Sequence, residues 1–256
     1  MIQDYPIIKN KLINFIKNEV EVSGTKGAVI GLSGGIDSAL TAYLSVEALG
    51  SGNVLGLLLP ENGIKSKQDI NDAMEVVKRL GIDHKIIEIN KVLSSFSSTI
   101  PDFDRGNLLA SGNLKARTRM CMLYYHANLM NRMVIGTGNR TELLLGYFTK
   151  YGDGGVDIEP IGGLYKTQVR GLSRHMKVPS HILDKTPTAG LWPGQTDEKE
   201  LGITYEEADK ILFKLIDEKM DGALVSKVFS RDHVDRLVAR LHANEHKRMP
   251  PKACDI

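Results

Sequence analysis

One stretch, 27–49, constrains the fold more than any other part of the chain. It begins with the apolar run Ala28–Leu32, continues through the glycine-rich turn Ser33–Ser38, and ends in a segment of helical period, Ala39–Leu49. This order predicts a buried strand, a loop and a helix. Because loop N–H groups and the positive end of the helix dipole would face the same side, the stretch predicts a phosphate site.

The loop differs from the two common phosphate-binding loops. The ordinary P-loop ends in Gly-Lys-[Ser/Thr], whereas this loop ends in Ile36–Ser38. The dinucleotide pattern G-x-G-x-x-G is also absent, because two residues separate Gly31 from Gly34. Asp37 stands where other loops place a lysine, which predicts a cation between its carboxylate and the phosphates. Mg²⁺ is the expected ion, since it binds one or two carboxylates together with phosphate oxygens.

Three further segments identify a family. Ser33–Ser38 resembles the SGGxDS pyrophosphate loop of the N-type ATP pyrophosphatases, which split ATP into AMP and pyrophosphate to activate an oxygen atom. Gly136–Glu142 is similar to the GTGNxxE motif of the NAD synthetases within that superfamily. Segments 146–154 and 157–162 resemble the GYxTKxGD and DxxPIG motifs of the same family. The matches run in order over nearly the whole chain, whereas the loop alone is also compatible with a plain capped turn.

The pattern of elements predicts an α/β fold. Alternating strands and helices indicate a parallel sheet with helices on both faces, and the resemblance implies a doubly wound, adenine nucleotide alpha hydrolase-like architecture. We expect one NAD synthetase domain over 1–256, with an ATP pyrophosphatase core over 23–180 and C-terminal helices over 204–248. The Pro/Gly-rich segment 185–203 around Trp192 is either a linker or a lid over the site. The resemblance implies no glutaminase domain, because members that use glutamine carry an additional amidase domain.

Apolar periodicity gives the boundaries of the individual elements. Helices are expected at 5–22, 66–80, 108–130, 166–176, 204–219, 221–229 and 231–247, and further strands at 54–59, 85–89 and 133–137.

The resemblance implies an ATP site at the loop and the neighbouring strand ends. We expect Asp37 and Glu142 to bind Mg²⁺, and Asp37 and Lys166 to be the catalytic residues. A lysine there would oppose the charge that develops on the departing pyrophosphate. By its pattern alone, Glu142 is equally compatible with a solvated acid at a helix start. The expected ATP-binding residues are Gly31, Leu32, Ser33, Gly34, Gly35, Ile36, Asp37, Ser38, Thr137, Lys166 and Thr188.

A second set of residues corresponds to the family's positions for deamido-NAD. It consists of Arg117, Lys150, Asp157, His246 and Lys247, and its cations suit phosphates and the nicotinate carboxylate. The pattern alone leaves Arg117 compatible with a solvated helix face and the last two with a dipole-complementing pair. The implied enzyme is a ligase of NAD biosynthesis. The carboxylate of deamido-NAD attacks ATP to form an adenylate, and ammonia then displaces AMP.

Composition excludes several other classes. The formal charge of +2 indicates no nucleic-acid partner, and no stretch is long and apolar enough to span a membrane. Two cysteines suit the reducing cytoplasm. A sister pyrophosphatase that modifies tRNA would need more cysteines or a basic extension, and a non-catalytic nucleotide-binding module would be expected to lose Asp37 and Glu142. The family implies a homodimer, for which the apolar stretch Met120–Met133 is either a subunit contact or core.

Overall fold

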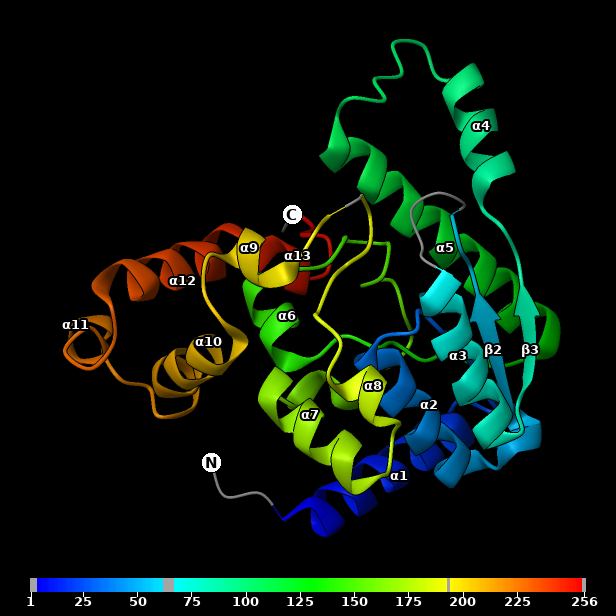
Figure 1. Cartoon of the computed structure of the whole chain (residues 1–256), viewed down its shortest axis with the longest axis horizontal. Helices are drawn as coiled ribbons and strands as arrows, with labels where there is room; N and C mark the ends of the chain where they lie inside the picture. The colour runs from blue at the N-terminus through cyan, green and yellow to red at the C-terminus, as the bar shows by residue number, and fades with distance from the viewer. Residues whose placement is uncertain (1–3, 62–66, 193, 255–256) are drawn as a thin grey trace.

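A parallel β-sheet forms the centre of the molecule. The computed structural model describes residues 4–61, 67–192 and 194–254. Within these residues the sheet has four strands in the order β3-β2-β1-β4 (Figure 1). The strands are β1 (Ala28–Gly31), β2 (Val54–Leu58), β3 (Asp83–Ile86) and β4 (Met133–Val134). The register places Ala28 of β1 opposite both Val54 and Met133, so β1 lies inside the sheet.

Helices cover both faces of the sheet, which confirms the doubly wound fold. Ala28 and Ile30 of β1 point into a core shared with helices α1 (Tyr5–Val22), α2 (Ile36–Leu49) and α3 (Lys67–Leu80). Val29 and Leu57 point to the other face, where they pack against α5 (Leu108–Met130). Alternate residues of the strands therefore serve two separate cores, as a sheet buried on both sides requires.

The C-terminal half builds a second core beside the first. Leu145, Tyr205, Leu212 and Leu237 are almost completely buried in it. Figure 1 shows its helices gathered on one side of the sheet. They are α6 (Arg140–Leu145), α9 (Asp197–Leu201), α10 (Tyr205–Leu212), α11 (Gly222–Val225), α12 (Arg231–Ala243) and α13 (Glu245–Arg248). Helices α7 (Lys166–His175) and α8 (Ser180–Leu183) pack in the first core instead, through Val169, Leu172 and Ile182. Short 3-10 turns lie at Ser51–Asn53 and Pro160–Gly163, and a π-helical turn lies at Phe213–Asp217.

Several boundaries differ from those expected. The strand expected at 133–137 ends at Val134, and Ile135 forms only an isolated bridge with Ile158. The loop expected at 185–203 contains α9 and closes at Gly202, whose φ is 71°. The last helix is divided at Asn244, whose side chain donates to the carbonyls of Leu145 and Arg240. The helix start expected at Ser66 lies outside the described residues.

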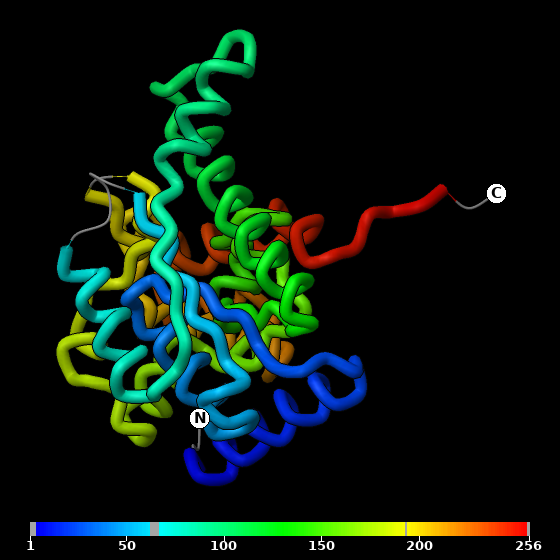
Figure 2. The backbone as a smooth tube through the Cα atoms, turned by 90° about the vertical axis from the view of Figure 1, so that its right-hand side faces the viewer, coloured from blue at the N-terminus to red at the C-terminus, as the bar shows by residue number. Residues whose placement is uncertain are grey.

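An arm projects from the compact part of the molecule. Helix α4 (Asn90–Thr99) and the first turns of α5 extend away from the sheet, and the chain after α13 also leaves the body (Figures 1 and 2). Leu109, Tyr125 and Leu129 of α5 expose 70%, 65% and 68% of their surface. The side of α5 opposite Tyr125 and Leu129 packs on the sheet through residues such as Leu123. Among the helices described, none is long and apolar enough to cross a membrane.

Candidate active site

The turn between β1 and α2 is already arranged for an anion. Its Ser38 hydroxyl accepts from the Ser33 N–H at 3.2 Å and donates to the Gly35 carbonyl at 3.0 Å. No side chain caps α2 at Gly35, so the first N–H groups of the helix stay available for a ligand. Gly34 has a φ of 80°, and a Cβ there would lie 2.2 Å from the Asp69 carbonyl oxygen. Only glycine fits that position.

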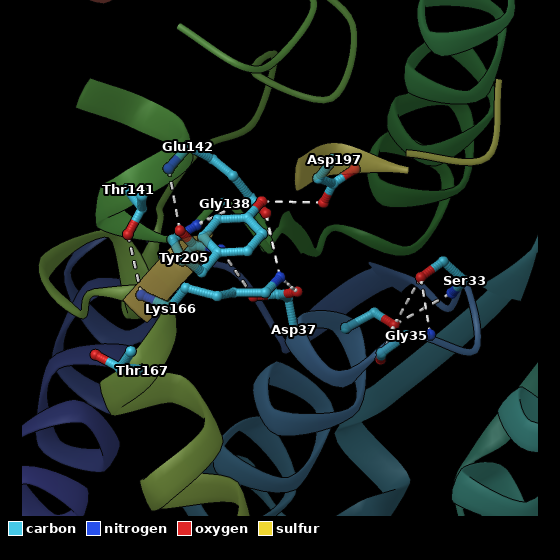
Figure 3. Close-up of polar contacts among 12 residues, drawn as sticks. Ser33, Gly35, Asp37, Gly138, Thr141, Glu142, Lys166, Thr167, Asp197 and Tyr205 are labelled. Carbon is cyan, nitrogen blue, oxygen red and sulfur yellow. Dashed lines mark hydrogen bonds and ion pairs between the residues drawn. The ribbon is translucent and has the colours of Figure 1, made fainter. Parts of the chain in front are cut away.

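Three charged side chains from three helices meet beside this loop. The Lys166 ammonium lies 2.5 Å from Oδ2 of Asp37 and 3.3 Å from Oε1 of Glu142. Figure 3 shows this cluster, with Asp37 at the start of α2, Glu142 on α6 and Lys166 at the start of α7. Burial acts to lower the pKa of Lys166, but the two carboxylates outweigh it and raise that pKa above its usual value. The lysine therefore remains protonated.

Asn139 holds the two carboxylates in place. Its side-chain oxygen accepts from the Glu142 N–H at 3.1 Å, while its own N–H donates to Oε2 of Glu142 at 3.3 Å, which completes a capping box on α6. Its amide nitrogen also donates to Oδ1 of Asp37 at 2.9 Å. Burial raises the pKa of Glu142, and the charge of Lys166 opposes that rise. The buried side-chain amide of Asn139 thus connects the segment between β4 and α6 to the pyrophosphate loop.

Helix α10 supports the lysine from behind. Both oxygens of Asp209 accept hydrogen bonds, one from the Thr141 hydroxyl at 2.6 Å and one from the Thr167 N–H at 2.8 Å. Thr141 in turn accepts from the Lys166 N–H at 3.0 Å. The Tyr205 ring lies on the same side, with its centroid 5.2 Å from the Lys166 ammonium. The second core therefore fixes where α7 begins and where its lysine points.

The cluster fits Mg²⁺ only in the company of phosphates. No group of three or more His, Cys, Asp or Glu side chains within the described ranges is arranged to hold a metal ion alone. Asp37 and Glu142 offer two carboxylates that share one ammonium. Mg²⁺ prefers oxygen ligands and commonly uses one or two carboxylates plus substrate phosphates. The residues present therefore suit an ion that arrives with a nucleotide.

A cavity of about 470 Å³ opens above the loop and contains most of the expected ATP site. Gly34 is not part of its lining, because this residue faces the Asp69 backbone instead. Thr188 contributes to the wall, and its hydroxyl donates to the Gln195 carbonyl at 2.8 Å. The predicted residues that line the cavity are Gly31, Leu32, Ser33, Gly35, Ile36, Asp37, Ser38, Thr137, Glu142, Lys166, Thr188 and Lys247.

The cations expected to bind the second substrate form a group of their own. Arg117 donates to the Lys150 carbonyl at 3.3 Å, and the Lys150 ammonium donates to the His246 carbonyl at 2.6 Å. Lys247 donates to the carbonyls of two residues after α6, at 2.6 and 2.9 Å. These contacts join α5, the 146–154 loop and α13, and only Lys247 among the four cations lines the cavity.

Asp157 does not belong to that group. One of its oxygens accepts from the Val134 N–H at 2.7 Å, and the other accepts from the Tyr124 hydroxyl at 2.9 Å. The carboxylate therefore extends the edge of the sheet where β4 ends, and its hydrogen bonds within the described residues go to Val134 and Tyr124 and not to the four cations. Its expected role in binding substrate stays a prediction.

Four residues of the site were absent from the expected set. They are Asn139, Asp197, Tyr205 and Asp209, and each is nearly or fully buried. The Asn-x-x-Glu spacing of the first is a recognisable capping signal. Tyr205 and Asp209 are four residues apart, so they share one face of α10 with apolar neighbours, and an acid on such a face signals a buried partner.

Comparison with known proteins finds relatives that match nearly the whole chain. A family model described as NAD synthase matches residues 8–251. The NH(3)-dependent NAD(+) synthetase of Methanosarcina acetivorans is 50% identical over 255 residues, which cover 99% of each chain. The NMN synthetase of Francisella tularensis is 38% identical with a TM-score of 0.89, and covers all of both chains. The NH3-dependent NAD synthetase of Campylobacter jejuni is 33% identical with a TM-score of 0.84, and the match covers 99% of this chain and 100% of that one.

Proposed function

The chain belongs to the NAD synthase family, and we propose that it joins ammonia to the nicotinate carboxyl group of deamido-NAD while ATP is split into AMP and pyrophosphate. The observation that carries this proposal is the buried ammonium of Lys166. It is held by Asp37 and Glu142 beside an uncapped helix N-terminus. A cation and free N–H groups facing one point suit a reaction in which negative charge builds on departing phosphates.

In the first step the carboxylate attacks the α-phosphorus of ATP, and the bond to the β-phosphate oxygen breaks. Pyrophosphate leaves with the electron pair of that bond. The N–H groups at the start of α2 and the hydroxyls of Ser33 and Ser38 hold its oxygens, while Lys166 donates to the oxygen that gains charge. Mg²⁺, when bound by Asp37 and Glu142 with the phosphates, supplies further positive charge.

In the second step ammonia attacks the acyl carbon of the adenylate. The bond from that carbon to the phosphate oxygen breaks, AMP leaves, and one proton of the ammonia goes to solvent. No protein nucleophile is needed, so the chain contributes orientation, charge and exclusion of water. Lys247 lines the same cavity, and Arg117, Lys150 and His246 are connected beside it by hydrogen bonds, so we assign these four cations to the phosphates of the second substrate.

The likeness to an NMN synthetase favours a second candidate, amidation of nicotinate mononucleotide. This compound presents the same carboxyl group without the second nucleotide. Purified protein should be assayed with ATP, Mg²⁺ and each acid in turn, with ammonium or glutamine as nitrogen donor. We expect NAD and AMP in equal amounts from deamido-NAD and ammonium, with a higher kcat/KM than for nicotinate mononucleotide. The reverse preference would establish the second candidate.

We also propose that two copies of the chain associate through α5. Tyr125 and Leu129 form an exposed apolar face on a helix whose other side packs on the sheet through Leu123. Sedimentation equilibrium should give a dimer that Leu129→Asp converts to a monomer. Leu224→Asp serves as the control, because Leu224 on α11 is also exposed, at 48%, but lies far along the chain from this face. A monomeric native protein would contradict the proposal.

A further inference from the structure

One carboxylate beside the catalytic cluster comes from the end of the lid loop, defined as 186–196 apart from residue 193. Asp197 is the first residue of α9 and is only 3% exposed. Its Oδ2 accepts from the Tyr205 hydroxyl at 2.9 Å. Its Oδ1 is also buried, and the described residues offer it no hydrogen-bond partner. Burial raises the pKa of Asp197, and the charge of Lys166 and the hydroxyls of Tyr205 and Tyr147 oppose that rise. A buried carboxylate with an unbonded oxygen is costly, so its position calls for a function.

Tyr205 links this carboxylate to the catalytic lysine. Burial raises the pKa of Tyr205 well above its usual value, so its hydroxyl stays protonated and donates to Asp197. The Lys166 ammonium lies 5.2 Å from the centroid of the same ring. Figure 3 shows the ring beside Lys166 with its hydroxyl directed at Asp197. Asp197 therefore fixes where the Tyr205 hydroxyl points, and the ring is one of the groups around the ammonium, together with Asp37 and Glu142.

The lid loop ends directly before Asp197. The Asp197 N–H donates to the Pro187 carbonyl at 3.1 Å and so closes the base of the loop. Inside the loop, the side-chain oxygen of Gln195 accepts from the Leu191 N–H at 2.8 Å. Lys115 of α5 donates to the Leu191 carbonyl at 2.9 Å, which ties the loop to the opposite wall of the cavity. When the lid loop makes these contacts, the Asp197 carboxylate lies against the Tyr205 hydroxyl.

We propose that Asp197 is a positioning residue that couples closure of the lid to the placement of Lys166 through the Tyr205 hydroxyl. The inference rests on the proposed function and adds a condition to it. With the lid seated, Lys166 is held for pyrophosphate departure and water is kept from the adenylate. With the lid displaced, the Tyr205 hydroxyl loses its acceptor, and the ammonium keeps Asp37 and Glu142 but loses a ring in fixed orientation. The adenylate then meets water before ammonia.

The first test is the ratio of NAD to AMP at limiting ammonium. Wild type should give about one NAD per AMP. Asp197→Leu and Tyr205→Phe should lower kcat and also release more AMP than NAD. The excess AMP comes from hydrolysis of the adenylate. Water adds its oxygen to the acyl carbon, the bond from that carbon to the phosphate oxygen breaks, AMP leaves, and the protons of the water go to solvent. Asp197→Asn keeps an acceptor for the Tyr205 hydroxyl, so its NAD to AMP ratio should lie between those of wild type and Asp197→Leu. Asp235→Asn on α12, where 69% of the side chain is exposed, is the charge-matched control.

The double variant Asp197→Leu/Tyr205→Phe separates coupling from general damage. If the two residues act as a unit, it should be no worse than the poorer single variant. Losses that multiply, or slower turnover with an unchanged NAD to AMP ratio, would overturn the proposal.

A second readout needs no turnover, so it is independent of the substrate. Trypsin should cleave after exposed Lys199 of α9 faster in Asp197→Leu and Tyr205→Phe than in wild type or Asp235→Asn. Equal cleavage rates would overturn the inference, even if deamido-NAD proved to be the wrong acid.

Discussion

Removing the Lys166 charge should destabilise the protein as well as inactivate it. The side chain is 3% exposed, and its ammonium contacts both Asp37 and Glu142. Methionine keeps most of the volume but leaves two buried carboxylates without their cation. Breaking a buried ion pair from one side costs about 3–5 kcal/mol. With roughly 2 °C per kcal/mol for a chain of this length, the midpoint of thermal unfolding should fall by about 6–10 °C.

Calorimetry of Lys166→Met without nucleotide and with a chelator measures this loss directly. The double variant Asp37→Asn/Lys166→Met should recover part of it, because one of the two uncompensated carboxylates is then neutral. Lys185→Met is the matched control. Lys185 also contacts two carboxylates, but 25% of its side chain is exposed, and Gln68 donates to one of them, Asp72. Its loss should therefore be smaller.

Two results would refute this reasoning. The first is a Lys166→Met variant that unfolds at the wild-type temperature. The second is a double variant less stable than Lys166→Met alone. Either result would mean that the lysine is not the charge that holds the two carboxylates together.

Three further outcomes are expected. Burial raises the pKa of Glu159 to about 8, so folding takes up a proton and the free energy of unfolding falls as pH rises from about 5 to 8. Glu159→Gln should flatten that slope in urea titrations by up to about 1.4 kcal/mol per pH unit, and an unchanged slope would contradict it. Gly34→Ala should raise the KM for ATP or lower stability, because its Cβ would meet the Asp69 carbonyl, whereas Gly52→Ala meets nothing within 4 Å and should be neutral. Arg117→Ala should raise the KM for deamido-NAD by roughly 10-fold or more through loss of a charged hydrogen bond, and equal effects on ATP would count against its role.

The pyrophosphate loop was the most predictable part of the site. Gly34 occupies a backbone position that no other residue can take, so the local sequence carries that part of the geometry. Asp37 and Glu142 lie far apart in the chain, yet both follow parallel strands whose carboxyl ends meet at one edge. Their proximity could therefore be predicted from topology and the family motif together.

The support behind Lys166 could not be predicted in the same way. Tyr205 and Asp209 reach the site only because α10, a helix of the second core, packs against α7. Periodicity shows that α10 has a buried face without showing what that face contacts. Asp197 could not be predicted from the sequence for a different reason. Helix α9 is only five residues long and lies in a Pro/Gly-rich segment, so its pattern resembles a loop.

The most direct test of the account follows an oxygen atom. Deamido-NAD with both oxygens of the nicotinate carboxylate labelled with ¹⁸O should be converted with ATP, Mg²⁺ and ammonium, and the products examined by mass spectrometry. An adenylated intermediate predicts one labelled oxygen in the phosphate of AMP and one in the amide of NAD. NAD formation with no label in AMP, or with label in pyrophosphate, would contradict attack on the α-phosphorus and with it the role assigned to Lys166.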